Sequence, residues 1–167
     1  MATTITYNNL VSESWQNVYD LIKSSVTDPL GQSNRKWVYT RDPNLKSLSG
    51  QQLPYIVVNP SMISFDDKQT VDLKVKTVNW SVELEIVSTD GVAGDALKGK
   101  GQTQNDSITD SLLSVFNSVT NRNTLAANGL KFSIPEVTAA GTIIINQQVV
   151  YRRSIFLSFK NKMSVSA

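Results

Sequence analysis

Residues 71–88, VDLKVKTVNWSVELEIVS, decide the fold of this chain. Apolar and polar side chains alternate through the stretch, which is typical of a strand with one face in the core and the other toward solvent. The apolar positions change from odd to even numbers near Thr77, and this change would turn the strand over. We therefore expect a β-bulge at Thr77–Val78, or a break in the strand there. A strand with one polar face favours an antiparallel sheet over a buried parallel one.

Two segments have the spacing of amphipathic helices. The first covers residues 9–26, can be capped by Asn8 or Asn9, and should end at Thr27-Asp28-Pro29, because the residue before a proline is pushed out of helical geometry. The second covers about residues 106–120, where Ser107 and Asp110 resemble a capping pair. Their apolar positions are Val11, Trp15, Val18, Ile22 and Val26 in the first helix, and Ile108, Leu112, Val115, Phe116 and Val119 in the second.

Shorter strands are predicted on both sides of these elements. They cover residues 36–40, residues 55–58 between Pro54 and Pro60, residues 130–134 before Pro135, and a hairpin of residues 142–146 and 149–160. Residues 41–53 and the glycine-rich residues 89–105 are predicted as loops, the second of them mobile, and residues 1–8 and 161–167 as flexible ends. The sequence predicts one α+β domain over residues 1–167, a mainly antiparallel β-sheet with two helices packed on one face.

The composition excludes several kinds of chemistry. The chain has 167 residues, with no His and no Cys. Ser-His-Asp hydrolysis, thiolate catalysis, structural zinc sites and disulfides therefore have no residues to carry them. Only 18% of the residues are charged, and the formal net charge is +2. This balance does not favour nucleic-acid binding by electrostatics alone. We expect no enzyme activity, no catalytic residues, no metal and no cofactor.

The N-terminal residues do not have the pattern of a signal peptide. The first residues, MATTITYNN, have neither the basic segment nor the apolar segment of a signal peptide. No stretch approaches the 18 or so consecutive apolar residues that a membrane-spanning helix needs. The expectation is a protein that stays in the cytoplasm where it is made and has no membrane partner.

One motif resembles a phosphate-binding loop. Residues 94–101, GDALKGKG, have the Gly-x4-Gly-Lys frame between a predicted strand and a predicted helix. However, Gly101 stands where the Ser or Thr that holds magnesium would be. The predicted helix also begins several residues too late, and the strand before the motif is half polar. We interpret the segment as a mobile loop, or as one that orders against a neighbouring subunit.

Six charged residues are candidates for contacts with a partner or another subunit: Lys98, Lys100, Arg152, Arg153, Glu83 and Glu85. The basic ones could bind DNA phosphates or an acidic surface, but charges at strand edges more often resist aggregation. Glu83 and Glu85 could hold a metal or act as acid and base, but they also fit the polar half of an alternating strand. Arg153 falls on an apolar face, so it needs a carboxylate or a subunit interface as its partner.

The order of elements resembles a known family. A helix over Trp15–Val26 is followed by the proline-bounded strand LPYIVVNP (residues 53–60) and the long strand WSVELEIV (residues 80–87). A flexible loop and a second helix follow, and YRRSIFLSF (residues 151–159) forms the last strand. Over about residues 9–160 this order resembles the tail terminator proteins of long-tailed bacteriophages and related tail-completion and neck proteins.

The resemblance implies a structural virion-assembly protein and not an enzyme. In this family an α+β subunit joins others, usually six, into a homo-oligomeric ring that caps the tail tube and meets the head connector. The expected partners are other copies of the chain, the tail tube protein and the connector or neck proteins, with passive contact to DNA in the channel. The expected location is the virion tail, and the host cytoplasm during assembly. Two alternatives stay open, another head–tail joining protein and a non-viral small adaptor domain.

Overall fold

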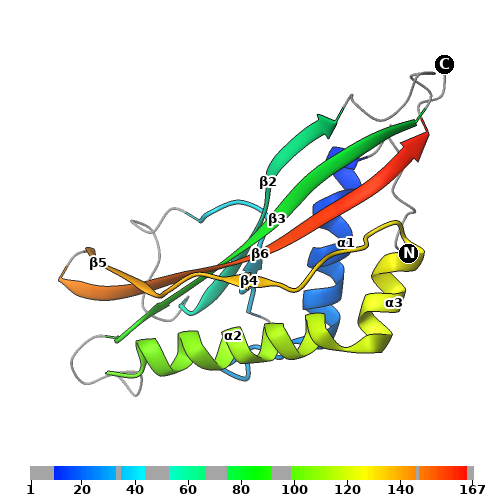
Figure 1. Cartoon of the computed structure of the whole chain (residues 1–167). Helices are drawn as coiled ribbons and strands as arrows, with labels where there is room; N and C mark the ends of the chain where they lie inside the picture. The colour runs from blue at the N-terminus through cyan, green and yellow to red at the C-terminus, as the bar shows by residue number, and fades with distance from the viewer. Residues whose placement is uncertain are drawn as a thin grey trace.

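A six-stranded sheet with helices on one face forms the molecule (Figure 1). The computed structural model describes residues 10–32, 35–43, 53–66, 75–91, 99–145 and 147–164. The helices are α1 (Leu10–Ser25), α2 (Gly101–Asn117) and α3 (Val119–Ala127). The strands are β1 (Val38–Tyr39), β2 (Tyr55–Asp66), β3 (Val75–Thr89), β4 (Glu136–Val137), β5 (Gly141–Ile145) and β6 (Gln148–Ser164).

The sheet has the order β1-β2-β3-β6-β4, and β5 also pairs with β6. Only β1 and β2 run parallel, and the other pairs are antiparallel. The prediction of an α+β fold with a mainly antiparallel sheet is therefore confirmed. The first helix and the hairpin of β5 and β6 lie within a few residues of their predicted positions.

The long strand β3 separates the two faces of the sheet. Its even-numbered side chains from Val78 to Ile86 pack in one core cluster with side chains of α1 and α2. Trp80 stacks on Phe159 of β6 there, with ring centroids 5.5 Å apart. Each fully buried aliphatic side chain of this kind contributes about 1.5–3 kcal/mol to folding. The odd-numbered positions carry Glu83 and Glu85 on the face without helices, beside a smaller cluster that includes Tyr55, Val57 and Val87.

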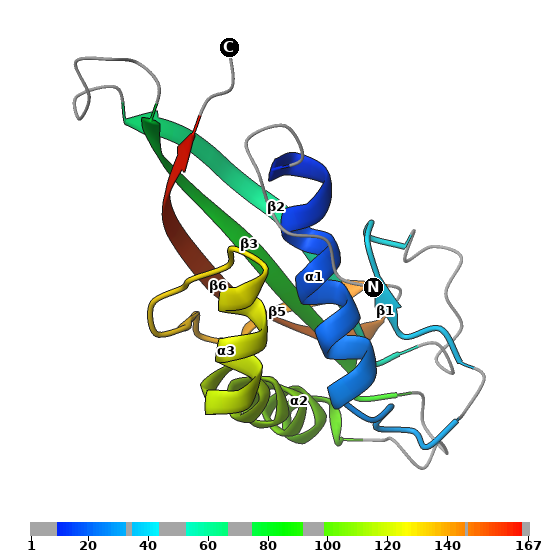
Figure 2. The same ribbon diagram turned by 90° about the vertical axis from the view of Figure 1, so that its right-hand side faces the viewer.

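The described residues form three helices and not the two that the sequence predicts. α2 ends at Asn117, and Ser118 takes an extended conformation (φ −61°, ψ 125°) before α3 begins. Asn121 and Asn123, which the sequence places beyond the helix, lie inside α3. Leu125 is the one buried residue of α3, so this helix has no apolar period that a sequence pattern could reveal. α1 packs on β2 and α2 on β3 and β6, whereas α3 packs on the other two helices (Figure 2).

The start of α2 is also earlier than predicted. The helix begins at Gly101, so Ser107 and Asp110 lie inside it and form no capping pair. β3 continues to Thr89, which shortens the predicted loop of residues 89–105 from both ends. The part of that loop at residues 92–98 lies outside the described residues, as do the predicted cap at Asn8 or Asn9 and most of the loop at residues 41–53.

The prediction of a β-bulge or a break in β3 is wrong. β3 pairs with β6 in one unbroken register from Val75 to Thr89, without a shift at Thr77–Val78. The shift lies instead in β2, between Pro60 and Met62. Proline has no N–H for the ladder, so β2 is irregular there but does not end, and it continues to Asp66. Residues 71–74 lie outside the described part of the chain.

Two smaller predictions near the C-terminus are wrong. Residues 130–134 form no strand, and only an isolated bridge joins Phe132 to Phe159. Part of the tail predicted to be flexible, residues 161–164, belongs to β6 and pairs with the first residues of β3. Residues 165–167 are not described. β6 extends to Ser164 because its last residues pair with the first residues of β3, from Val75.

Candidate interaction surface

A polar cluster lies on the face of the sheet without helices. Arg152 of β6 is paired with Glu85 of β3, with Nη1 3.0 Å from Oε1, and with Asp42, with Nη2 3.5 Å from Oδ2. The Tyr55 hydroxyl donates to Asp42 Oδ1 at 3.1 Å. Beside this group the Ser154 hydroxyl donates to Glu83 Oε1 at 2.6 Å. Glu83 and Glu85 therefore have partners on the neighbouring strand β6. Both side chains are half-buried, whereas the alternation of the sequence predicts that they face solvent.

Burial sets the ionisation of this cluster. Burial raises the pKa of Glu85 above its usual value, and Asp42 and Glu83 add to the effect, while the Arg152 guanidinium opposes it. Burial and the neighbouring Asp42 carboxylate also raise the pKa of Tyr55. Each of these groups already has a partner inside the molecule. The cluster therefore holds β2, β3 and β6 and the segment at Asp42 together.

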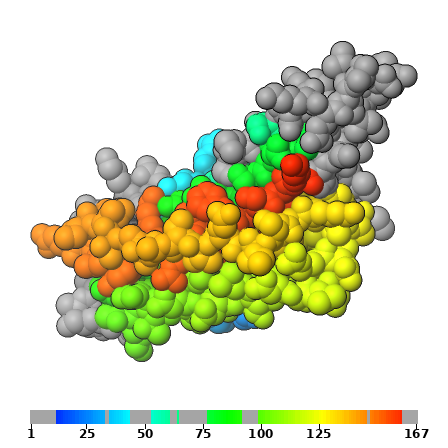
Figure 3. Space-filling model, viewed as in Figure 1, coloured from blue at the N-terminus to red at the C-terminus, as the bar shows by residue number. Residues whose placement is uncertain are grey.

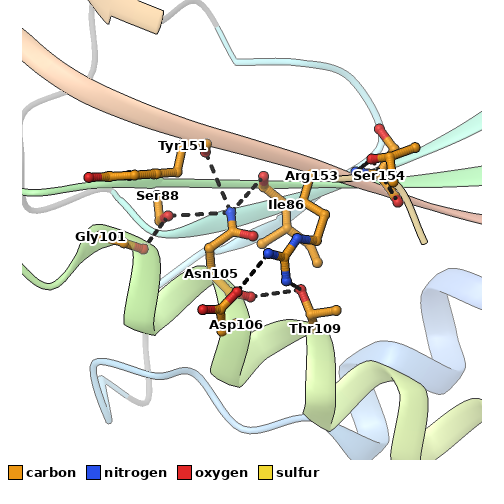
Figure 4. Close-up of polar contacts among 10 residues, drawn as sticks. Ile86, Ser88, Gly101, Asn105, Asp106, Thr109, Tyr151, Arg153 and Ser154 are labelled. Atoms are coloured by element: carbon orange, nitrogen blue, oxygen red, sulfur yellow. Dashed lines mark hydrogen bonds and ion pairs between the residues drawn. The ribbon is translucent and has the colours of Figure 1, made fainter. Parts of the chain in front are cut away.

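Arg153 has the carboxylate partner that its position requires. It lies on the helix side of β6, with Nη2 2.7 Å from Oδ1 of Asp106 in α2 and Nη1 3.4 Å from the Thr109 hydroxyl (Figure 4). The first of the two partners expected for this residue is therefore present. Arg152 and Arg153 follow each other in the chain but point to opposite faces of the sheet, so they do not form one basic patch.

The start of α2 is joined closely to the sheet. Asn105 is fully buried, and its Nδ2 donates to the Ile86 carbonyl at 3.2 Å and lies 3.4 Å from the Ser88 hydroxyl. That hydroxyl donates to the Gly101 carbonyl at 2.7 Å (Figure 4). A Cβ on Gly101 would lie 2.6 Å from the carbonyl carbon of Thr89, so the contact leaves room only for glycine. These contacts fix the angle between α2 and the sheet.

The geometry at the start of α2 also argues against a phosphate site at residues 94–101. The helix begins directly at the motif, at Gly101, so the argument that it starts too late is wrong. The end of the helix is nevertheless occupied, because the Gly101 N–H donates to the Asp90 carboxylate at 3.0 Å. Tyr151 donates to the second oxygen of Asp90 at 2.9 Å. A carboxylate of the chain stands where a phosphate would be, and β3 is antiparallel on both sides.

Of the two lysines in that motif, Lys100 alone lies in the described residues. Lys100 is exposed at the position before α2. Lys98 lies outside the described residues. Of the six residues singled out from the sequence, the structure brings together Glu83, Glu85 and Arg152, and it separates Arg153 and Lys100 from them. Among the described residues no group of three or more carboxylates could hold a metal ion.

A cavity of about 700 Å³ lies between the end of α1 and residues 26–38. Lys23, Trp37 and the ion pair of Asp28 with Arg35 line it. Arg35 Nη2 is 2.9 Å from Asp28 Oδ1 and also donates to the Pro54 carbonyl at 2.6 Å. Burial alone would raise the pKa of Asp28. The hydrogen bonds and charge of Arg35, with hydrogen bonds from the backbone, outweigh burial, so the pKa lies below its usual value. Arg35 therefore joins this segment to Pro54, directly before β2, and its charge is already paired with that of Asp28.

Apolar side chains are exposed along one edge of the sheet. Ile134, Val137, Ile143 and Ile144 are 77%, 42%, 41% and 77% exposed, and we call them the apolar edge strip. They belong to the segment that runs beside β6 through β4 and β5, the yellow to orange band across the front of Figure 3. The four are spread along the edge, and Ile143 and Ile144 point to opposite faces of β5. Exposed apolar side chains along an open strand edge suit a contact with another protein.

The candidate residues taken from the sequence do not include this strip. Its signal was present nevertheless: residues 137–151 contain no charged side chain, although they include an exposed hairpin. Natural edge strands usually carry a lysine, a proline or a bulge that prevents pairing with other chains. Pro135 and Glu136 interrupt the strip between Ile134 and Val137, but β5 has neither a charge nor a proline. The uncharged edge of β5 is therefore a better guide to an interface here than the charged residues.

No family model matches this sequence, and no match is found among the curated proteins. None of the helices in the described residues is both long enough and apolar enough to cross a membrane. The surface itself therefore carries the functional argument.

Proposed function

We propose that this chain is a structural subunit of a phage tail, similar in role to a tail terminator. In this role copies of the chain form a ring that caps the tail tube and meets the head connector. The ring would be part of the virion tail, assembled in the host cytoplasm. The observation that carries the proposal is the apolar edge strip, together with an order of elements that resembles that family.

The physical reasoning starts from exposure. Ile144 and Ile134 each leave 77% of their surface in water in the single chain, which costs free energy that a protein partner would recover. The polar groups that could have formed a small-molecule site are instead paired with each other, as with Glu85 and Arg152 or Asp106 and Arg153. The features left unmatched on the surface are therefore suited to contact with another protein.

The strip favours a subunit of an assembly over a free-standing adaptor. It follows a strand edge, where backbone N–H and C=O groups are available for pairing, so its partner is expected to add a strand to the sheet. With 18% charged residues the chain also has little charge to repel other copies of itself. A ring of identical subunits needs such a contact between unlike surfaces, repeated until it closes.

The test is the mass of the purified chain in solution over a hundredfold range of concentration, with negative-stain images of the same samples. We expect closed rings with an open channel, in a fraction that grows with concentration. A monomer at every concentration would contradict the proposal and favour the adaptor. Open filaments or closed dimers would show self-association without a cap, and would favour another joining protein.

A further inference from the structure

The outer side of β5 is an open strand edge without protection. β5 pairs with β6 along its whole length, from Gly141 opposite Arg152 to Ile145 opposite Gln148. Within the described part of the chain no strand pairs with its other side. Ile143 and Ile144 are exposed there, and the segment has neither a charged residue nor a proline. Such an edge binds another strand unless something blocks it.

The end of β6 is open as well, but it is guarded. Beyond the bridge between Phe132 and Phe159, no described segment pairs with the outer side of β6. The sequence there is KNKMS, which places Lys160 and Lys162 on the edge. Lysine on an edge strand disfavours pairing, because a second strand would have to desolvate its charge. This edge is therefore unsuited to a contact between copies.

The outer side of β2 is divided into three parts. β1 covers Ile56 and Val57, and the Ile56 N–H donates outward to the Trp37 carbonyl at 2.8 Å. Because backbone groups alternate along a strand, Pro60 also faces outward, and it has no N–H to offer. Past the irregularity at Pro60, the five residues Met62–Asp66 have a partner only on their β3 side among the described residues.

We propose that β5 of one copy pairs with Met62–Asp66 of β2 in a second copy. The inference deepens the proposed function and rests on it, because a ring closes only through two unlike surfaces. β5 lies on the β6 edge of the sheet, near the end of β3, whereas Met62–Asp66 lies on the opposite edge, beside Thr77–Ser81 (Figure 1). Copies joined this way add head to tail, and neither surface is used twice.

The two segments, Gly141–Ile145 and Met62–Asp66, also match in having little charge. The only charge in either is Asp66, at the end of its segment, so pairing buries little charge. Pro60 limits the contact on one side and the hairpin turn limits it on the other. These limits confine the pairing to a short ladder, in which the neighbour covers Ile143 and Ile144 of the apolar edge strip.

The absence of cysteine gives a direct test, because any introduced pair holds the only thiols. Ser64 and Thr142 are both exposed, so Ser64→Cys is combined with Thr142→Cys, Ile143→Cys or Ile144→Cys to cover the possible registers. Each double variant is assembled under reducing conditions, imaged, and then oxidised. A disulfide needs Cβ atoms about 3.5–4.5 Å apart, so it forms only where the strands pair.

We expect a ladder of covalent dimers, trimers and higher species from at least one double variant. Neither single variant should form more than trace dimers, and Ser64→Cys with Lys160→Cys, on the guarded edge, should form none. Rings that assemble but give no ladder would overturn the inference and leave the proposed function standing. Covalent dimers from Thr142→Cys alone would show that β5 pairs with itself, which also overturns it. Double variants that unfold at the wild-type temperature but stay monomeric by mass, as the wild type then does too, would overturn both this inference and the proposed function.

Discussion

Arg153 of β6 reaches Asp106 of α2, with Nη2 2.7 Å from Oδ1, across the boundary between the sheet and the helix layer. The arginine side chain is 17% exposed and the aspartate is 46% exposed, so the pair lies at the margin of the core. A charge in this place is tolerated because its partner stands on the helix that covers the same face. The contact therefore sets the position of α2 as well as the charge balance.

Removing Asp106 from this pair should cost more stability than removing Arg153. Asp106→Ala leaves the Arg153 charge partly buried and should lower the free energy of unfolding by about 1–2 kcal/mol, less than for a fully buried pair because Asp106 is half in water. Arg153→Met places an apolar side chain on an apolar face and should be nearly neutral. Urea unfolding of both variants and of the double variant gives the coupling energy. Equal losses from the two single variants would contradict this view of the pair.

Gly101 should tolerate no side chain. In Gly101→Ala the new Cβ would lie 2.6 Å from the carbonyl carbon of Thr89 and 2.8 Å from both the Asp90 nitrogen and Cδ2 of Tyr151. Two of these neighbours are backbone atoms, so the helix start must move, at a cost of about 1–3 kcal/mol. Gly141→Ala is the control, because its Cβ would meet only the Arg152 carbonyl oxygen, at 3.9 Å. Thermal unfolding should separate the two, and a Gly101→Ala variant as stable as the control would show that the contact is looser.

Glu85 should make the protein less stable as the pH rises. Burial holds its folded-state pKa above the usual value of 4.5, although Arg152 pulls the other way. The unfolded chain therefore loses this proton first, and the free energy of unfolding falls as the pH climbs from about 4.5 through the folded-state pKa. Glu85→Gln removes this penalty, so the variant should match the wild type near pH 4 and be more stable near pH 7.

The measurement for Glu85 is urea unfolding of wild type and variant at several pH values between these limits. Glu136→Gln is the control for the change from carboxylate to amide, because Glu136 is exposed on β4. A Glu85→Gln variant that loses stability near pH 7 would show that the ion pair with Arg152 outweighs burial, contrary to the direction of the pKa shift.

Strong periodicity explains what could be predicted about the fold. In β3 the buried even positions from Val78 to Ile86 alternate with half-buried odd positions, as the sequence pattern predicts. The pattern fails where tertiary contacts decide. α2 begins at Gly101 because Asp90 accepts its N–H from across the loop, and glycine by itself reads as a loop residue. β2 passes through Pro60 because the outer side of the strand needs no donor there.

The candidate interface was harder to predict, for a different physical reason. The sequence predicts an interface at charged residues, because their partners cannot be read from the sequence. In the folded chain Arg152, Arg153, Glu83 and Glu85 all have partners within the subunit. Ile143 and Ile144 belong to the apolar run of residues 143–145, which the sequence alone does not distinguish from a buried strand. The folded chain shows that β5 has no partner on its outer side among the described residues.

A charge on the apolar edge strip should prevent assembly without unfolding the subunit. Ile144→Lys puts a lysine on β5, where a neighbouring strand would have to bury it, and this is the means by which natural edges avoid pairing. Val119→Lys is the matched control, because Val119 in α3 is 73% exposed and Ile144 is 77% exposed. Both changes should alter the free energy of unfolding of the single subunit by no more than about 0.5 kcal/mol, since neither side chain is buried. Sedimentation velocity should show at least a tenfold weaker association for Ile144→Lys and unchanged association for Val119→Lys. Equal association of the two variants would mean that copies of the chain meet through another surface.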